Sequence, residues 1–208
     1  MTADAIDGVI AIIRLRETTV PDEAFTALVA GGVRWIEVTV DTPGALAAVS
    51  RWRELGQARV GVGTVRTAEH ALRAAEAGAQ FFVTPTVQAE VLDTARQHHV
   101  PVVCGALSPT EIDVAWQGGA RAVKVFPVDA VGGPQYVNAV RAPLPDVPLV
   151  PTGGVTPALA EEYAWLGCAG VGVATSLVDE ATVRAGDWAA IERSAAAFVQ
   201  AWEAGRGR

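Results

Sequence analysis

The stretch "QGGARAVKVFP", residues 117–127, contains a helix end, a glycine stop and a short apolar strand pattern in that order. Glycine commonly follows the last turn of a helix, and a brief run of apolar, β-branched residues after it is typical of a buried strand. The same order recurs in "VAGGVRWIEVTV" at 29–40, "EAGAQFFVTP" at 76–85 and "LGCAGVGVAT" at 166–175. The repetition predicts four units in which a helix is followed by a strand.

Four further apolar runs predict strands between these units, at 8–14, 58–64, 100–105 and 147–154. Helical patterns separate the strands, at 22–30, 43–55, 67–77, 87–98, 108–118, 134–141, 156–165 and 187–203. Several of these begin with good start signals: Thr67, the "SPTEI" segment, and Thr156 before Pro157.

Eight strands alternating with eight helices indicate a parallel sheet. The repeat length of about 26 residues favours a small (β/α)8 TIM barrel, with residues 1–208 as a single domain. The alternative is a doubly wound open sheet. That fold usually has fewer strands and often carries a glycine-rich dinucleotide turn, and no such turn follows the first strand here.

Composition excludes several classes of partner. The 23 acidic residues outnumber the 16 basic ones, and the resulting net charge of −7 argues against nucleic acid and anionic membranes but not against a small anion. No apolar run approaches the ~18 residues that span a membrane, and no signal pattern begins the chain, so a cytosolic protein is expected. Cys104 and Cys168 have no metal or redox spacing and are expected to be buried; the histidines show no metal-site pattern either.

Polar residues inside the predicted strands are expected to face the barrel lumen. Strand side chains alternate between faces, and the outer face must be apolar because it packs on helices. In "WIEVT", Ile36 and Val38 then face outward and Glu37 faces inward, and in "AVKVF" the same rule puts Lys124 inside. Three more polar residues are expected on the lumen side: Arg14 with Ile10 and Ile12, Thr64 with Val60 and Val62, and Thr152 with Val150. Most lie near the carboxyl ends of strands, where barrel enzymes carry their chemistry.

Lys124 is the only lysine; the other fifteen basic residues are arginine. An ion pair with Glu37 is one explanation, although arginine usually serves such a pair as well or better. A lysine amine, unlike arginine, can lose a proton and form a Schiff base with a carbonyl. Apolar neighbours such as Phe126 and a cation such as Arg14 would lower the lysine pKa from ~10.4 toward ~7–8. Together with one carboxylate, this suggests imine chemistry on a keto acid.

An ordered set of motifs resembles the 2-keto-3-deoxy-6-phosphogluconate / 4-hydroxy-2-oxoglutarate aldolase family, whose members are class I, Schiff-base aldolases. The motifs are "AIIR", "AGGVRWIEVT", "VGVGTV", "AGAQFFVTP", "VKVFP", "GGPQYV", "PTGGVTP" and "CAGVGVATSLV". The "GGPQY", "GGVTP" and "CAG" segments are most similar to the branch acting on 2-keto-3-deoxy-6-phosphogalactonate.

The resemblance implies roles for individual residues. Lys124 matches the Schiff-base lysine and Glu37 the general acid/base. The substrate-binding positions that it implies are Arg14, Thr64, Pro85, Phe126, Thr152, Gly153, Gly154, Ala174 and Thr175. It also implies a homotrimer with no metal or organic cofactor, which cleaves its substrate reversibly to pyruvate and an aldehyde such as glyceraldehyde 3-phosphate.

Two positions depart from the family pattern. Asp41 stands where some members have an arginine that binds the keto-acid carboxylate, so that task falls to Arg14, Thr64 and backbone N–H groups. Ala174 stands where glycine often precedes a hydroxyl residue, so phosphate binding at Ala174 and Thr175 is less secure.

Two alternative functions stay open at this point. One is a phosphate-binding TIM-barrel isomerase or transferase, which the "TGGV" segment would also fit. The other is a non-catalytic barrel that binds sugar acids. The single lysine expected in the lumen favours the aldolase, because neither alternative needs an imine.

Overall fold

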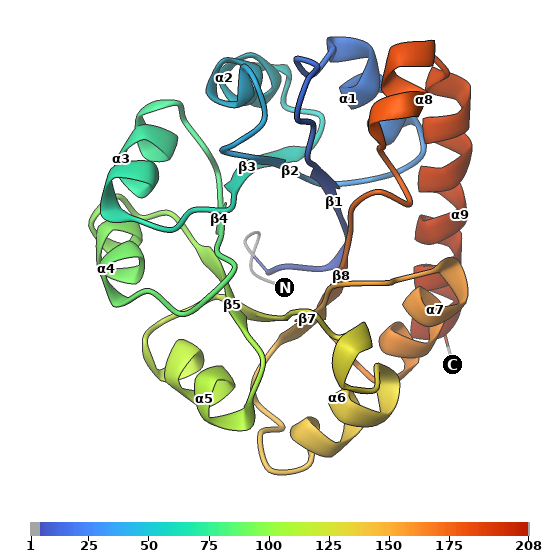
Figure 1. The fold of residues 1–208 in the computed structure, drawn as a ribbon. Coiled ribbons are helices and arrows are strands. Elements are labelled where there is room, and N and C mark those ends of the chain that lie inside the picture. The colour runs from blue at the N-terminus through green and yellow to red at the C-terminus, as the bar shows by residue number, and fades with distance from the viewer. Residues whose placement is uncertain (1–4, 208) are drawn as a thin grey trace.

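The computed structural model describes residues 5–207 and contains a ring of eight parallel strands with helices around it (Figure 1). The strands are β1 (Gly8–Ile13), β2 (Trp35–Thr39), β3 (Arg59–Gly63), β4 (Phe82–Val83), β5 (Val102–Ala106), β6 (Ala122–Val125), β7 (Leu149–Pro151) and β8 (Gly170–Val173). All eight predicted strands are present.

Each strand from β1 to β6 pairs in parallel with the next one along the chain, and β8 pairs with β1. The last gap is spanned by a parallel bridge between Thr152 and Gly172, and by the Ala169 N–H, which donates to the Leu149 carbonyl at 2.9 Å. The ring is therefore a (β/α)8 TIM barrel, and the alternative of a doubly wound open sheet is wrong.

The helices lie outside the ring (Figure 1). They are α1 (Asp22–Ala30), α2 (Ala45–Leu55), α3 (Ala68–Glu76), α4 (Ala89–Gln97), α5 (Pro109–Gln117), α6 (Pro134–Arg141), α7 (Pro157–Trp165), α8 (Glu180–Ala185) and α9 (Trp188–Arg206), with a 3-10 turn η1 (Asp129–Val131) after β6. The predicted start signals are confirmed: Thr67, Ser108 and Thr156 each accept a backbone N–H of the first helical turn. The sequence patterns missed only the short elements η1 and α8.

Apolar side chains form two separate layers. The larger cluster packs the outer strand face against the helices and includes Ile36, Val38, Val123 and Val125. The smaller cluster fills the lumen: Ile6, Ile10, Trp35, Phe81, Val83, Val103, Ala122 and Val150. These positions confirm the inward direction expected for Glu37, Lys124 and Thr152, because each shares a strand face with a lumen residue.

The predicted face of β3 is wrong. Val60 and Val62 belong to the outer cluster, and the alternating Gly61 and Gly63 face the lumen, where a β-carbon on Gly61 would meet Phe81. Thr64 still reaches the lumen side because its φ of 58° interrupts the strand alternation. The sequence pattern placed Thr64 correctly for an incorrect reason.

Within residues 5–207, no helix has both the length and the apolar character that crossing a bilayer requires.

Candidate active site

A cavity of about 150 Å³ opens at the carboxyl ends of the strands. Ten of the eleven site residues suggested by the sequence line it: Arg14, Thr64, Pro85, Lys124, Phe126, Thr152, Gly153, Gly154, Ala174 and Thr175. The eleventh, Glu37, is buried in the lumen and interacts electrostatically with both Lys124 and Arg14. The fold therefore gathers residues from six strands and their following loops into one pocket.

Lys124 projects from β6 into this pocket and is only 7% exposed. Its Nζ lies 5.1 Å from the centroid of the Phe126 ring. Burial lowers the pKa of Lys124, because a desolvated ammonium is costly; the negative charge of Glu37 raises it, and the positive charge of Arg14 lowers it. A larger fraction of neutral amine is therefore available at neutral pH than for an exposed lysine.

Glu37 is 1% exposed, and within residues 5–207 neither of its carboxylate oxygens has a hydrogen-bond partner. Burial raises the pKa of Glu37, while Lys124 and Arg14 act in the opposite direction. Buried polar atoms almost always have partners, so an unpartnered carboxylate beside a cavity indicates a group held ready for a ligand or a proton.

The carboxylate of Glu37 occupies space that a side chain at position 63 would otherwise fill. A β-carbon on Gly63 would lie 1.7 Å from Glu37 Oε1, far inside any allowed contact. Sequence reasoning missed Gly63. The alternation of glycine and valine in "VGVGT" was the available signal, because it leaves one strand face without side chains.

Arg14 supplies a cation at the pocket wall, and its guanidinium donates to Thr64 Oγ1 at 2.9 Å. Asp41, which stands where some relatives have arginine, does not line this pocket. It lines a separate hollow with His70 and Arg73. Asp41 is therefore outside the lining of this pocket, and Arg14 is the arginine that lines it among residues 5–207.

The opposite side of the pocket is formed by two loops. Gly153 and Gly154 have φ angles of 111° and 60°, which favour glycine, and they precede α7, whose first turn is capped by Thr156. Ala174, Thr175 and Ser176 follow β8. A helix N-terminus and backbone N–H groups suit an anion.

Asp129 is a second residue that the sequence analysis missed. Its carboxylate packs against the Gly153–Gly154 loop so closely that a β-carbon on Gly153 would lie 2.7 Å from Asp129 Oδ1. A negative charge beside this loop reduces the attraction for a phosphate dianion.

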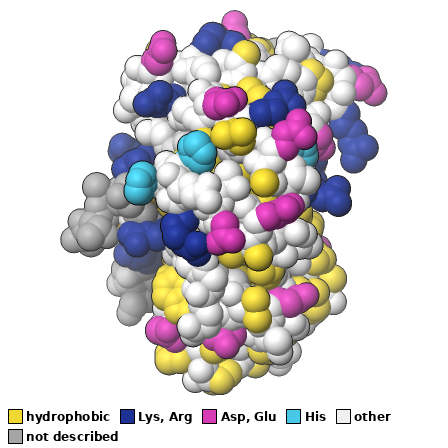
Figure 2. Space-filling view, turned by 90° about the vertical axis from the view of Figure 1, so that its left-hand side faces the viewer, with side chains coloured by type: hydrophobic (Ala, Val, Ile, Leu, Met, Phe, Trp, Pro, Cys, Tyr) yellow, Lys and Arg dark blue, Asp and Glu magenta, His cyan; other side chains and the backbone are white. Residues whose placement is uncertain are grey.

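A larger hollow of about 890 Å³ lies at the other end of the barrel, at the amino ends of the middle strands. Its lining includes Arg53, Arg96, His98 and His99 but neither Lys124 nor Glu37. Figure 2 looks onto the side that carries α3 and α4, where arginine and histidine side chains gather among acidic ones. The candidate active site is the smaller cavity because its wall carries the Lys124 amine and the Arg14 cation, both of which interact with the buried carboxylate of Glu37.

Among the described residues, 5–207, no group of three or more His, Cys, Asp or Glu side chains is placed to hold a metal ion. Cys104 and Cys168 are both buried, as expected, and burial raises the pKa of each thiol, to about 12 for Cys168.

Comparison with known proteins agrees with this geometry. A family model described as "KDPG and KHG aldolase" matches residues 5–194. A 2-dehydro-3-deoxy-phosphogluconate aldolase from Pseudomonas aeruginosa is 39% identical over 169 residues, which cover 80% of this chain and 76% of the relative. A 2-dehydro-3-deoxy-6-phosphogalactonate aldolase from Escherichia coli K12 is 35% identical over 202 residues, covering 92% and 94% of the two chains.

A solved structure extends the likeness to three dimensions. The KDPG aldolase from Legionella pneumophila, with pyruvate captured at low pH as a covalent carbinolamine intermediate, matches with a TM-score of 0.82 at 27% identity, covering 94% of this chain and 95% of that one. Since the family model spans nearly the whole chain and two relatives exceed 30% identity over most of their length, the chain belongs to the KDPG and KHG aldolase family.

Proposed function

We propose that the protein is a class I aldolase that reversibly cleaves a 2-keto-3-deoxy-6-phospho-sugar acid, or 4-hydroxy-2-oxoglutarate, to pyruvate and an aldehyde. The observation that carries the proposal is the pairing, in one lumen, of a buried lysine with a lowered pKa and a buried carboxylate without a hydrogen-bond partner. Family membership and the captured carbinolamine of the Legionella relative support it.

The neutral amine of Lys124 attacks the C2 carbonyl of the substrate and forms a carbinolamine. Loss of water from that adduct gives an iminium ion, and Glu37 moves the protons that these steps require. Glu37 then removes the proton of the C4 hydroxyl. The C3–C4 bond breaks, the aldehyde leaves, and the electron pair moves to the iminium nitrogen as an enamine.

The enamine takes a proton at C3, and water hydrolyses the resulting pyruvate iminium to release pyruvate and the free amine of Lys124. Arg14 and Thr64 bind the keto-acid carboxylate, while Pro85 and Phe126 form the pocket wall. The loop residues Thr152, Gly153 and Gly154, with Ala174 and Thr175, receive the far end of the substrate. Charge-assisted hydrogen bonds from Arg14 contribute ~1.5–3 kcal/mol to carboxylate binding.

The family resemblance adds a homotrimer with no requirement for a metal or organic cofactor. The cytoplasmic location expected from the sequence completes the proposal. The two alternatives, a phosphate-binding isomerase or transferase and a non-catalytic sugar-acid binder, gain no support from the relatives, which are aldolases.

The experiment that tests the function is a turnover assay. Pyruvate release is measured over a panel of phosphorylated and unphosphorylated 2-keto-3-deoxy acids and 4-hydroxy-2-oxoglutarate, without added metal and again with a chelator. Cleavage of at least one of them at a rate that the chelator does not change is expected. No cleavage of any member of the panel would contradict the proposal.

Phosphate recognition gives the first specific prediction. The parent should prefer a phosphorylated substrate over its unphosphorylated analogue by at least about tenfold in kcat/KM, equivalent to ~1.4 kcal/mol. Gly154→Val should abolish the preference, because valine strains the φ of 60° and its β-carbon would meet Asp129. Ala174→Gly is the matched variant and should increase the preference. Equal kcat/KM for both substrates in the parent would move the substrate toward unphosphorylated hydroxy-oxo acids.

Gly63 gives the second prediction. Gly63→Ala should lower kcat for cleavage by at least about tenfold, because its methyl group would displace the Glu37 carboxylate. In a Glu37→Gln background, Gly63→Ala should lower kcat much less, because the carboxylate that the methyl group would displace is already absent. The effect of Gly63→Ala on kcat is therefore compared in both backgrounds. An equal loss in the two backgrounds would show that Gly63 acts in some way other than through Glu37.

A further inference from the structure

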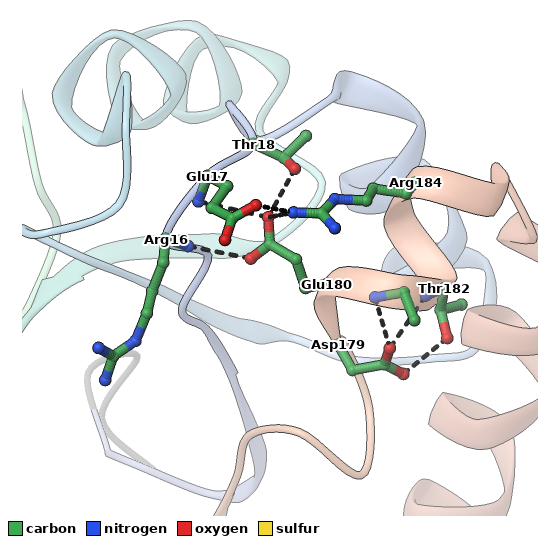
Figure 3. A network of polar contacts seen from close by, with 8 residues as sticks. Arg16, Glu17, Thr18, Asp179, Glu180, Thr182 and Arg184 are labelled. Atoms are coloured by element: carbon green, nitrogen blue, oxygen red, sulfur yellow. Dashed lines mark hydrogen bonds and ion pairs between the residues drawn. The ribbon is translucent and has the colours of Figure 1, made fainter.

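The carboxylate of Glu180 joins the amino end of α8 to a loop on the neighbouring chain segment (Figure 3). Glu180 is the first residue of α8, and the atoms that it binds lie in the loop between β1 and α1. Its Oε2 accepts the Arg16 N–H at 3.0 Å, and its Oε1 accepts the Glu17 N–H at 3.3 Å and the Thr18 hydroxyl at 2.6 Å. Three hydrogen bonds from consecutive residues converge on one carboxylate.

Glu180 is held firmly on its own side. Asp179 Oδ1 caps α8 by accepting the N–H groups of Ala181 and Thr182 at 2.8 and 2.9 Å (Figure 3). Just before it, Leu177 and Val178 are buried, and both donate their N–H groups to the carbonyl of Ala174. Burial and these hydrogen bonds therefore anchor the segment from the pocket residue Ala174 to the start of α8.

The loop that Glu180 holds is the loop that carries Arg14. Arg14 lies two residues before Arg16, and its guanidinium donates a hydrogen bond to Thr64 Oγ1, which lines the same pocket. Leu15 is buried, and its N–H donates to Thr42 Oγ1, which anchors the start of the loop. Residues 16–18 beyond it are largely exposed, so burial does not hold them in place. The hydrogen bonds to Glu180 restrain this part of the loop instead.

We propose that Glu180 is a positioning residue that holds the β1–α1 loop against α8 and so keeps the Arg14 guanidinium in place for the substrate carboxylate. The inference rests on the proposed function, in which Arg14 binds the keto acid. Hydrogen bonds to an ionised carboxylate are about twice as strong as neutral ones, which suits a loop anchor. The hydrogen bond from Thr18 is the main cause that lowers the pKa of Glu180, so the anchor is ionised at neutral pH.

The test measures imine formation with pyruvate, trapped by borohydride, as a function of pyruvate concentration. Glu180→Ala should raise the half-saturating pyruvate concentration at least about fivefold, and leave the limiting rate within about twofold. Glu180→Gln should give a smaller rise because its amide oxygen still accepts one donor. Arg184→Ala is the control within the network: it removes the ion pairs to Glu17 and Glu180 but leaves the three hydrogen bonds to the Glu180 carboxylate, so it should change little.

A double variant separates positioning from general loss of structure. In an Arg14→Leu background, Glu180→Ala should cause no further rise in the half-saturating pyruvate concentration, because Arg14, the residue through which Glu180 acts, is gone. Additive effects, or equal half-saturation in the parent and both Glu180 variants, would overturn the inference while the proposed function stands. A parent that forms no imine would overturn the proposed function, and the inference with it.

Discussion

Lys124→Arg should reduce aldol cleavage by at least about 10⁴-fold, since residues that form the covalent intermediate account for effects of this size or larger. Arginine keeps the positive charge and most of the length of the lysine side chain. Its guanidinium stays protonated and cannot form an imine with a carbonyl. A structural ion pair with Glu37 would survive this substitution, so the variant separates the catalytic role of Lys124 from the structural one.

Covalent trapping measures the same role directly. Pyruvate with borohydride should add one reduced pyruvoyl group to the parent, and peptide mass spectrometry should find it on Lys124. The chain has no second lysine, so the amino terminus is the rival amine. Lys124→Arg supplies the matched control, in which Lys124-dependent label disappears and any label on the amino terminus remains. An unmodified Lys124 in the parent under turnover conditions would rule out the Schiff-base mechanism.

Glu37→Gln should slow cleavage by roughly 10²–10⁴-fold, the usual contribution of a positioned acid or base. Glutamine is nearly the same size, so the pocket above Gly63 should accommodate it. The imine with pyruvate should still form, although more slowly, because the nucleophile is intact. Single-turnover cleavage and borohydride trapping therefore have to be measured on the same variant. Cleavage at the parent rate would remove Glu37 from the mechanism.

The same variant should shift the pH dependence of imine formation. Lys124 attacks as the neutral amine, so the rate rises as pH passes upward through its pKa. The charge of Glu37 raises that pKa and the charge of Arg14 lowers it. Glu37→Gln should therefore move the acidic limb to lower pH, and Arg14→Leu should move it to higher pH. Shifts in the same direction for both variants would contradict the arrangement of charges in the pocket.

Most of the secondary structure could be predicted because the signals are local. The glycine stops, the apolar strand runs and the cap residues Thr67, Ser108 and Thr156 each act within a few residues of themselves. The six-residue helix α8 was missed because its apolar pattern is short. Its start signal, Asp179, is visible in the sequence. The residues after Asp179 do not continue as a long run of helical apolar spacing, so the signal by itself did not predict a helix.

The positions of the site residues were predictable to the extent that strands alternate. The rule worked for Lys124 and Glu37, whose neighbours are large apolar residues that must face the helices. It failed for β3, where valines alternate with glycines and either face could be the outer one. Packing decided the direction, because only the glycine face leaves room for Phe81 and Glu37 inside the narrow lumen.

The sequence by itself therefore determined the barrel, the single lysine within it and the family. Each of these follows from local periodicity, residue identity or the order of motifs. The tertiary structure decided that Glu37 lies unpartnered over Gly63, that Thr64 turns into the pocket with a positive φ, and that Glu180 reaches the loop of Arg14 across 164 positions of sequence. These features depend on which side chains of distant strands and loops compete for the same space and the same hydrogen bonds. That competition exists only once the barrel has closed.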